Sequence, residues 1–236
     1  MLLDKEVDFN KCNNDWRSPL MCACSNGHTE IFRMLLDKGA RYDTVDKEGW
    51  SPFMSACSYG HTEIVTLLLE RRVDYINCNK DGWSPLMFAC RNGHTEIVNM
   101  LLERQVDYNK CNTDGWSPVM FASNNGHTEI VRMLLDRGAS YDICDKDGRS
   151  PILCDCNKGH THIVKILLEK GASYDTSDKD GWSPIMSACK MGHTNIVKIL
   201  LDKGANNDTC DKKGWSPVMF ACEKGHTVIV KIMLDR

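Results

Sequence analysis

The sequence predicts an all-α fold, a solenoid in which short helix–turn–helix units stack on one another and are joined by β-hairpin-like loops. A proline recurs every 33 residues, a Gly-His pair keeps the same interval, and seven copies follow one another without an insertion. Such a repeat is typical of a solenoid, because each copy buries its apolar face only against its neighbours. The repeated prolines are Pro19, Pro52, Pro85, Pro118, Pro151, Pro184 and Pro217.

The first helix of each copy has a start signal and a stop signal. In the third copy, Ser84 can cap a helix and Pro85 suits its first turn. Gly93 is the residue best able to take a left-handed conformation at a helix end. We therefore expect a short helix between Ser84 and Gly93.

A second helix is predicted after the Gly-His pair. Thr95 can cap it, and Glu96 suits its positive end. The segment that follows this helix is rich in Asn, Asp and Gly, which suits a tight turn or hairpin. The apolar residues of the helix have the spacing of a single helical face: Ile97, Val98, Leu101 and Leu102.

We predict a single repeat array over residues 1–236. Neither end carries the polar copy that normally covers the core of a solenoid. We therefore expect a segment of a longer array or an incomplete chain, which is monomeric if its ends are properly capped. The copies are the tail of a partial repeat at 1–12, full repeats at 13–45, 46–78, 79–111, 112–144, 145–177 and 178–210, and a truncated last repeat at 211–236.

Composition argues against several classes of partner. The net charge of −3 gives no basic face for a nucleic acid or an anionic membrane. The first residues lack the pattern of a signal peptide, and no apolar run approaches the ~20 residues of a membrane span. Thirteen cysteines without an export signal indicate reduced thiols. We expect a cytoplasmic protein, with the nucleus as the other compartment, and neither a nucleic-acid nor a membrane partner.

The repeated unit resembles the ankyrin repeat. Its pattern, with x for any residue, is D-x-x-G-W-S-P-x-M-x-A-C-x-x-G-H-T-E-I-V-x-x-L-L-x-x-G-A, and it runs in phase over nearly the whole chain. The resemblance implies an ankyrin-repeat solenoid in which the repeated His ties the loops of adjacent copies together. It also implies a concave face that meets protein partners.

The chain departs from the ankyrin pattern at two kinds of position. The family usually carries Thr-Pro-Leu-His where this chain has Ser-Pro-x-Met, so we expect methionine to fill that space as an apolar group. Arg72 and Gln105 stand where a helix-ending Gly is expected, and a left-handed conformation there would cost up to ~1–2 kcal/mol each. The methionines concerned are Met54, Met87, Met120, Met186 and Met219.

The cysteines also recur at the repeat interval. Equivalent points on packed helices lie ~8–10 Å apart, which is too far for a disulfide or a shared zinc ion. We expect small buried side chains, with a metal or disulfide ladder as the alternative. The columns are Cys24, Cys57, Cys90, Cys156, Cys189 and Cys222; Cys12, Cys78, Cys111, Cys144 and Cys210; and Cys22 with Cys154.

The histidines of the Gly-His pairs are interpreted as structural, because catalysis requires one constellation of groups within hydrogen-bond reach rather than seven copies of one residue. We predict no enzyme, no cofactor, no metal site and no small-molecule substrate. An enzyme hypothesis would use the one cluster of titratable groups that is not repeated, in the fifth copy: Arg149, Asp155, His160 and His162.

A tryptophan precedes Ser-Pro in five copies, and Arg149 interrupts the series. By the ankyrin resemblance, this position lies beside the hairpin on the concave side. One hypothesis is a row of binding anchors, because Trp and Arg dominate interface hot spots. The other, which is compatible with it, is that each Trp packs on its neighbour's hairpin and stiffens the array. The tryptophans are Trp50, Trp83, Trp116, Trp182 and Trp215.

Other positions vary from copy to copy while the framework stays constant. By resemblance they line the same concave face, and a constant frame with variable inner positions is typical of a binding surface. Neutral drift at exposed positions is the alternative. The candidate partner-binding residues of this kind are Phe88, Phe121, Phe220, Tyr59 and Arg91.

Asp155 replaces an alanine that the six other copies keep. A carboxylate at a close helix contact must find a partner or shift its pKa. The nearest candidate partners by sequence are Arg149 and His160. A designed pair with Arg149, a softened copy and simple decay are three explanations, and we favour softening or decay.

The function that the sequence predicts is non-catalytic binding of a protein partner on a concave, Trp-lined face. The alternative is a structural spacer or scaffold segment of a larger multidomain protein.

Overall fold

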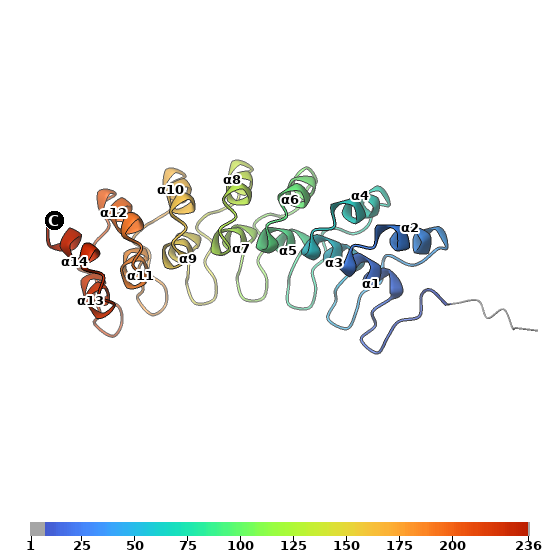
Figure 1. The fold of residues 1–236 in the computed structure, drawn as a ribbon, viewed down its shortest axis with the longest axis horizontal. Coiled ribbons are helices and arrows are strands. Elements are labelled where there is room, and N and C mark those ends of the chain that lie inside the picture. The colour runs from blue at the N-terminus through green and yellow to red at the C-terminus, as the bar shows by residue number, and fades with distance from the viewer. Residues whose placement is uncertain (1–7, 236) are drawn as a thin grey trace, which may run out of the picture. The chain divides into compact units, whose positions relative to one another are not determined.

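The computed structural model describes residues 8–235 of the chain. It divides into two compact units, Met1–Asp107 (unit 1) and Tyr108–Arg236 (unit 2). The described residues form fourteen helices, arranged in successive pairs and connected by loops, and they contain no strand. The predicted all-α solenoid of paired helices is therefore confirmed, and turns rather than strands form the connecting loops (Figure 1).

Unit 1 contains three helix pairs. Its first helices pack side by side in one row, and its second helices form another row beside it (Figure 1). The first helices are α1 (Pro19–Asn26), α3 (Pro52–Tyr59) and α5 (Pro85–Asn92), and the second helices are α2 (Thr29–Asp37), α4 (Thr62–Glu70) and α6 (Thr95–Leu102).

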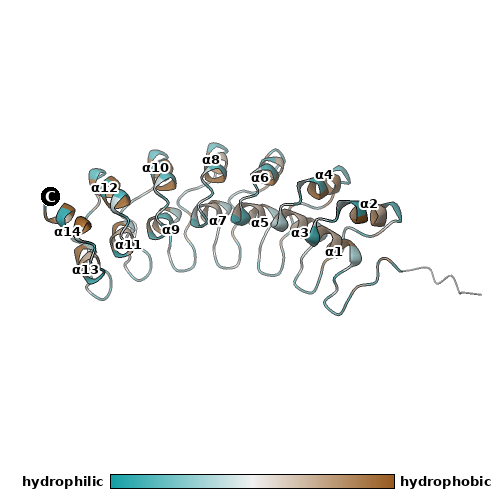
Figure 2. Ribbon diagram, in the orientation of Figure 1, coloured by the Kyte–Doolittle hydropathy of each residue, from teal (hydrophilic) through white to brown (hydrophobic). Residues whose placement is uncertain are grey.

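Unit 2 contains four pairs with the same packing of first on first and second on second helices. The first helices are α7 (Pro118–Asn124), α9 (Pro151–Lys158), α11 (Pro184–Met191) and α13 (Pro217–Glu223), and the second helices are α8 (Thr128–Asp136), α10 (Thr161–Glu169), α12 (Thr194–Asp202) and α14 (Thr227–Leu234). Helices α8, α10 and α12 are hydrophobic toward the first helices and hydrophilic on the far side (Figure 2).

The first helices begin and end as predicted. The hydroxyl oxygen of Ser84 accepts the backbone N–H of Met87, and Gly93 ends α5 with a φ of 79°. The prediction that Thr95 caps the second helix is wrong. Helix α6 begins at Thr95 itself, His94 is the cap residue, and no side chain makes the capping bond.

The predictions made for the two kinds of departure from the ankyrin pattern, the methionines and the missing glycines, are each confirmed only in part. Met54, Met87, Met120 and Met186 are buried, as predicted, whereas Met219 in α13 is exposed. Arg72 is left-handed, with a φ of 55°, but Gln105 is not.

The repeated histidine links successive repeats, as the family resemblance implies. Nε2 of His94 lies 2.9 Å from the carbonyl oxygen of Ser58, one repeat earlier. Its ring also covers Gly60, where an added Cβ would lie only 2.5 Å from the ring. The Gly-His pair thus serves both as a helix stop and as a contact between repeats.

Candidate protein-binding face

The first helices and the loops that precede them form one face in each unit, and this face carries the tryptophan series. Each tryptophan is positioned by an Asx turn. In the second repeat, Oδ1 of Asp46 accepts the backbone N–H groups of Glu48 and Trp50, both at 2.9 Å. In the sixth repeat, Oδ1 of Asp178 accepts the N–H of Trp182 in the same way. The loop backbone therefore fixes where each indole leaves the chain.

In unit 1 two indoles enclose a phenylalanine. The ring of Phe88 lies 4.3 Å from Trp50, in the preceding repeat, and 5.0 Å from Trp83, in its own repeat. The guanidinium of Arg91 lies 5.2 Å from the Trp83 ring, within the range of a cation–π contact.

In unit 2 the same arrangement recurs at the last two repeats. Phe220 lies 4.6 Å from Trp182 and 5.2 Å from Trp215. The ammonium of Lys190 lies 4.5 Å from the Trp182 ring. In the fourth repeat Trp116 packs on Phe121 at 5.2 Å. Aromatic rings thus tie neighbouring repeats together along this face.

The candidate residues differ in exposure. The five tryptophans are half-buried, so each indole packs on the frame and still presents an edge to solvent. Phe88, Phe121 and Phe220 are only 4–5% exposed and form the support beneath the indoles. Tyr59 is 58% exposed and stacks on His61, apart from the tryptophan stacks.

Arg149 folds back onto its own loop. Its Nη2 lies 2.7 Å from Oδ2 of Asp145, whose side chain is 1% exposed, and 2.9 Å from Oδ2 of Asp147. The hypothesis that Arg149 pairs with Asp155 is therefore wrong. The turn residue of the fifth repeat supplies the buried carboxylate instead.

Asp155 is fully buried in α9, and its partner is His160. Oδ1 of Asp155 lies 3.1 Å from Nδ1 of His160, which also lies 2.9 Å from the carbonyl oxygen of Ser123. Burial raises the pKa of Asp155 to about 6, and the neighbouring His160 and Ser123 side chains partly offset that rise. The hydrogen bond with Asp155 in turn raises the pKa of His160.

Ser123 is the residue of this cluster that the sequence reasoning missed. It stands in the column where the other first helices carry cysteine, and it lies in the fourth repeat, which precedes the repeat of Asp155. Two substitutions on adjacent first helices therefore meet in one buried polar cluster. The coincidence of the two departures was a signal for this contact.

All thirteen cysteines are free. The prediction of small buried side chains is confirmed for five members of the first column, whose thiol pKa values burial raises: Cys24, Cys57, Cys90, Cys156 and Cys189. It is wrong for the sixth member, Cys222 in the last repeat, and for Cys22 in the first repeat, both of which are exposed. Cys154 is also buried. The prediction is wrong for the loop column, in which Cys12, Cys144 and Cys210 are exposed, because this column lies in the connecting loops and not between helices.

Residues 8–235 contain no cluster of three or more His, Cys, Asp or Glu side chains placed to hold a metal ion. Within the same range, no helix has the length and apolarity needed to cross a bilayer.

Profiles of ankyrin repeats together match residues 1–234. One, describing three copies, matches residues 1–77, 73–145 and 139–209, and another, describing many copies, matches residues 187–234. The chain belongs to the ankyrin-repeat family. No curated protein matches it. Ankyrin repeats generally serve as protein–protein interaction modules, and the family is typically non-catalytic.

Proposed function

We propose that this ankyrin-repeat protein holds a protein partner on the face formed by its first helices and loops, with the tryptophan series as anchors. The observation that carries the proposal is the set of half-exposed indoles stacked on buried phenylalanines, such as Trp182 and Trp215 on Phe220.

These stacks favour binding because they are ordered before a partner arrives. A partner that contacts a preformed ring loses less conformational entropy than one that must order a mobile side chain. Trp and Arg side chains dominate the energetics of known interfaces. Arg91 and Lys190, which lie over two of the indoles, add positive charge beside the rings. The face thus combines rigid aromatic edges with flanking cations.

The alternative is a structural spacer, and one observation favours it. The Trp50–Phe88 and Trp182–Phe220 contacts each join neighbouring repeats, so the indoles also resist bending and local opening. Under this alternative, removing an indole lowers stability and leaves partner binding unchanged.

Affinity measurements on matched variants separate the two. Proteins captured from a cell extract by the intact chain are purified, and their affinities are then measured by calorimetry. The test variant is Trp182→Ala/Trp215→Ala. The control is Val228→Ala/Leu234→Ala, which removes two exposed apolar side chains from α14, a second helix of the same unit.

We expect the tryptophan variant to lose about thirtyfold or more in affinity, since truncating one hot-spot residue costs about 2 kcal/mol or more. The α14 variant should bind as the intact chain does. Circular dichroism and urea unfolding establish that both variants are folded at the assay temperature. Unchanged affinity of a folded tryptophan variant would refute the binding proposal and support the spacer.

A further inference from the structure

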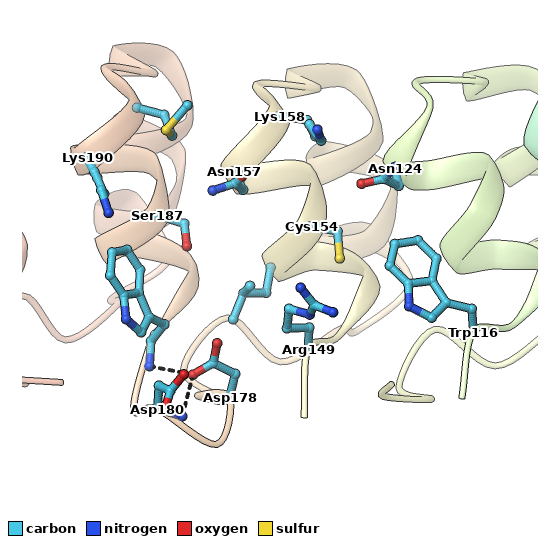
Figure 3. Close-up of a pocket in the computed structure, with 13 residues that line it drawn as sticks. Trp116, Asn124, Arg149, Cys154, Asn157, Lys158, Asp178, Asp180, Ser187 and Lys190 are labelled. Carbon is cyan, nitrogen blue, oxygen red and sulfur yellow. Dashed lines mark hydrogen bonds between the residues drawn. The ribbon is translucent and has the colours of Figure 1, made fainter. Parts of the chain in front are cut away.

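A cavity of about 420 Å³ opens in unit 2 at the interruption of the tryptophan series. Trp116 and Trp182 both line it. In Figure 3, Arg149 and Cys154 lie between Trp116 and Ser187, which also lines the cavity. Its volume falls within the usual range of small-ligand pockets, about 300–1,000 Å³.

The cavity exists because three aromatic positions in a row are vacant. The position five residues after the tryptophan column carries phenylalanine in the third, fourth and seventh repeats. In the fifth and sixth repeats it carries Cys154 and Ser187, and the tryptophan between them is replaced by Arg149. Elsewhere in unit 2, at the Trp182–Phe220–Trp215 stack, rings occupy both the tryptophan column and the phenylalanine column. The cavity therefore lies where the repeat pattern would place rings.

The arginine does not close this gap. Its Nε and Nη2 atoms both lie 2.7 Å from Oδ2 of Asp145, and a third contact to Asp147 holds it against the loop. These carboxylates neutralise the guanidinium, so it does not require an acidic group from a ligand. A guanidinium held flat in this way offers its face for stacking on an aromatic ring.

Two lysines lie at the helix-end side of the cavity. Lys158, near the end of α9, and Lys190, near the end of α11, appear there in Figure 3, while Asp178 and Asp180 lie at the loop side. Within the described part of the chain neither lysine forms an ion pair, whereas Arg149 has two. The positive charge without an acidic partner therefore belongs to the two lysines and not to Arg149.

We propose that this cavity receives an aromatic side chain of the protein partner, adjacent in the partner to a carboxylate that faces Lys158 and Lys190. This inference rests on the proposed function and adds the chemistry of the partner. In the cavity, the partner's ring would stack on its neighbours as Phe220 stacks between Trp182 and Trp215. The phenylalanine ring of that stack also has a lysine beside it, because Lys190 lies 5.6 Å from the Phe220 ring. The chain's own stacks thus supply the template for the contact.

The experiment titrates three small probes into isotopically labelled protein and follows the backbone amides by NMR. N-acetyltryptophan carries both an indole and a carboxylate, N-acetyltryptophan amide lacks the charge, and N-acetylleucine lacks the ring. We expect N-acetyltryptophan to bind most tightly, with shifts confined to residues around Arg149, Cys154 and Ser187.

Variants of the chain test the location. Ser187→Phe and Cys154→Phe each refill one ring position with a residue that the same column already accommodates in three other repeats, and each should abolish the N-acetyltryptophan shifts. Lys158→Ala/Lys190→Ala should remove the preference for the acid over the amide. Lys165→Ala/Lys198→Ala, which deletes two exposed lysines from α10 and α12, should retain it.

Three results would overturn the inference: equal shifts with N-acetylleucine, no saturable shift with any probe, or shifts that persist in both folded phenylalanine variants. An acid and an amide that bind equally would overturn the part that concerns the carboxylate. None of these results touches the broader function. A captured partner that depends on Trp182 and Trp215 but binds Ser187→Phe normally would leave the proposed function standing and this inference refuted.

Discussion

Replacing Asp155 by alanine should stabilise the protein, and by an amount that increases with pH. Asp155 is fully buried, and its pKa rises from 3.8 to about 6 chiefly because burial disfavours the charged carboxylate. A rise of about two units corresponds to about 3 kcal/mol of unfavourable free energy once the group is ionised in the folded state. Alanine, which the six other repeats carry here, removes that cost.

The sign follows from proton binding. Between about pH 4 and pH 6 the folded protein holds a proton on Asp155 that the unfolded chain has released, so stability falls as pH rises through this range. His160, whose pKa is also raised, contributes stability below its ordinary value near 6.5, and this contribution is lost as pH rises through its folded-state pKa. Both groups therefore make the protein less stable at about pH 8 than at about pH 5.

Urea unfolding of the intact chain and of Asp155→Ala across that pH range measures the effect. Only the last pH unit below the folded-state pKa of Asp155 falls within this range, so through Asp155 the difference in unfolding free energy should grow by about 1.4 kcal/mol between about pH 5 and about pH 8, in favour of the variant. The loss of the His160 contribution in the intact chain acts in the same direction. Asp142→Ala, which removes an exposed carboxylate from the same unit, controls for the change in net charge. A difference that does not change with pH, or one that favours the intact chain more strongly at high pH, would refute the reasoning.

The remaining predictions concern the frame. Arg72→Gly should raise the unfolding free energy by about 1 kcal/mol, because its φ of 55° suits glycine, and urea unfolding measures this. Gly60→Ala should lower the melting temperature, since a Cβ there would lie 2.5 Å from the His94 ring at a φ of 79°; an unchanged melting temperature would contradict that packing. Ser84→Ala should cost about 1 kcal/mol through loss of the cap on the Met87 N–H, which amide hydrogen exchange in α5 can detect.

Periodicity was sufficient to predict the fold. The proline, Gly-His and apolar positions each report a local requirement, such as a cap, a left-handed residue or a buried stripe, and seven repetitions make the requirement plain. The cap of the second helix was mispredicted because two adjacent residues, His94 and Thr95, could both precede the helix. The pattern of residue types does not show which peptide group enters the helix first.

The candidate site was only partly predictable. The tryptophan column could be read directly, but its packing on phenylalanines such as Phe220 depends on how far each repeat is displaced from the next. The choice of Asp145 over Asp155 as the partner of Arg149 depends on the fold of the Asx turn, which directs a buried carboxylate at the arginine. Charge and sequence proximity alone favoured neither partner.

In a chain of near-identical repeats, we propose that the residues that select one particular partner are those that break several columns at once. Single departures, such as Arg72, change one repeat locally. In the fourth to sixth repeats the departures coincide and meet in space: Ser123 lies beside the Asp155–His160 pair, and Arg149, Cys154 and Ser187 open one cavity. Independent drift would scatter such changes over many contacts, whereas a site requires them to be adjacent. The fifth repeat and its neighbours in unit 2 are therefore where partner selection should be tested first, and the tryptophan stacks on either side provide the frame that holds that region in place.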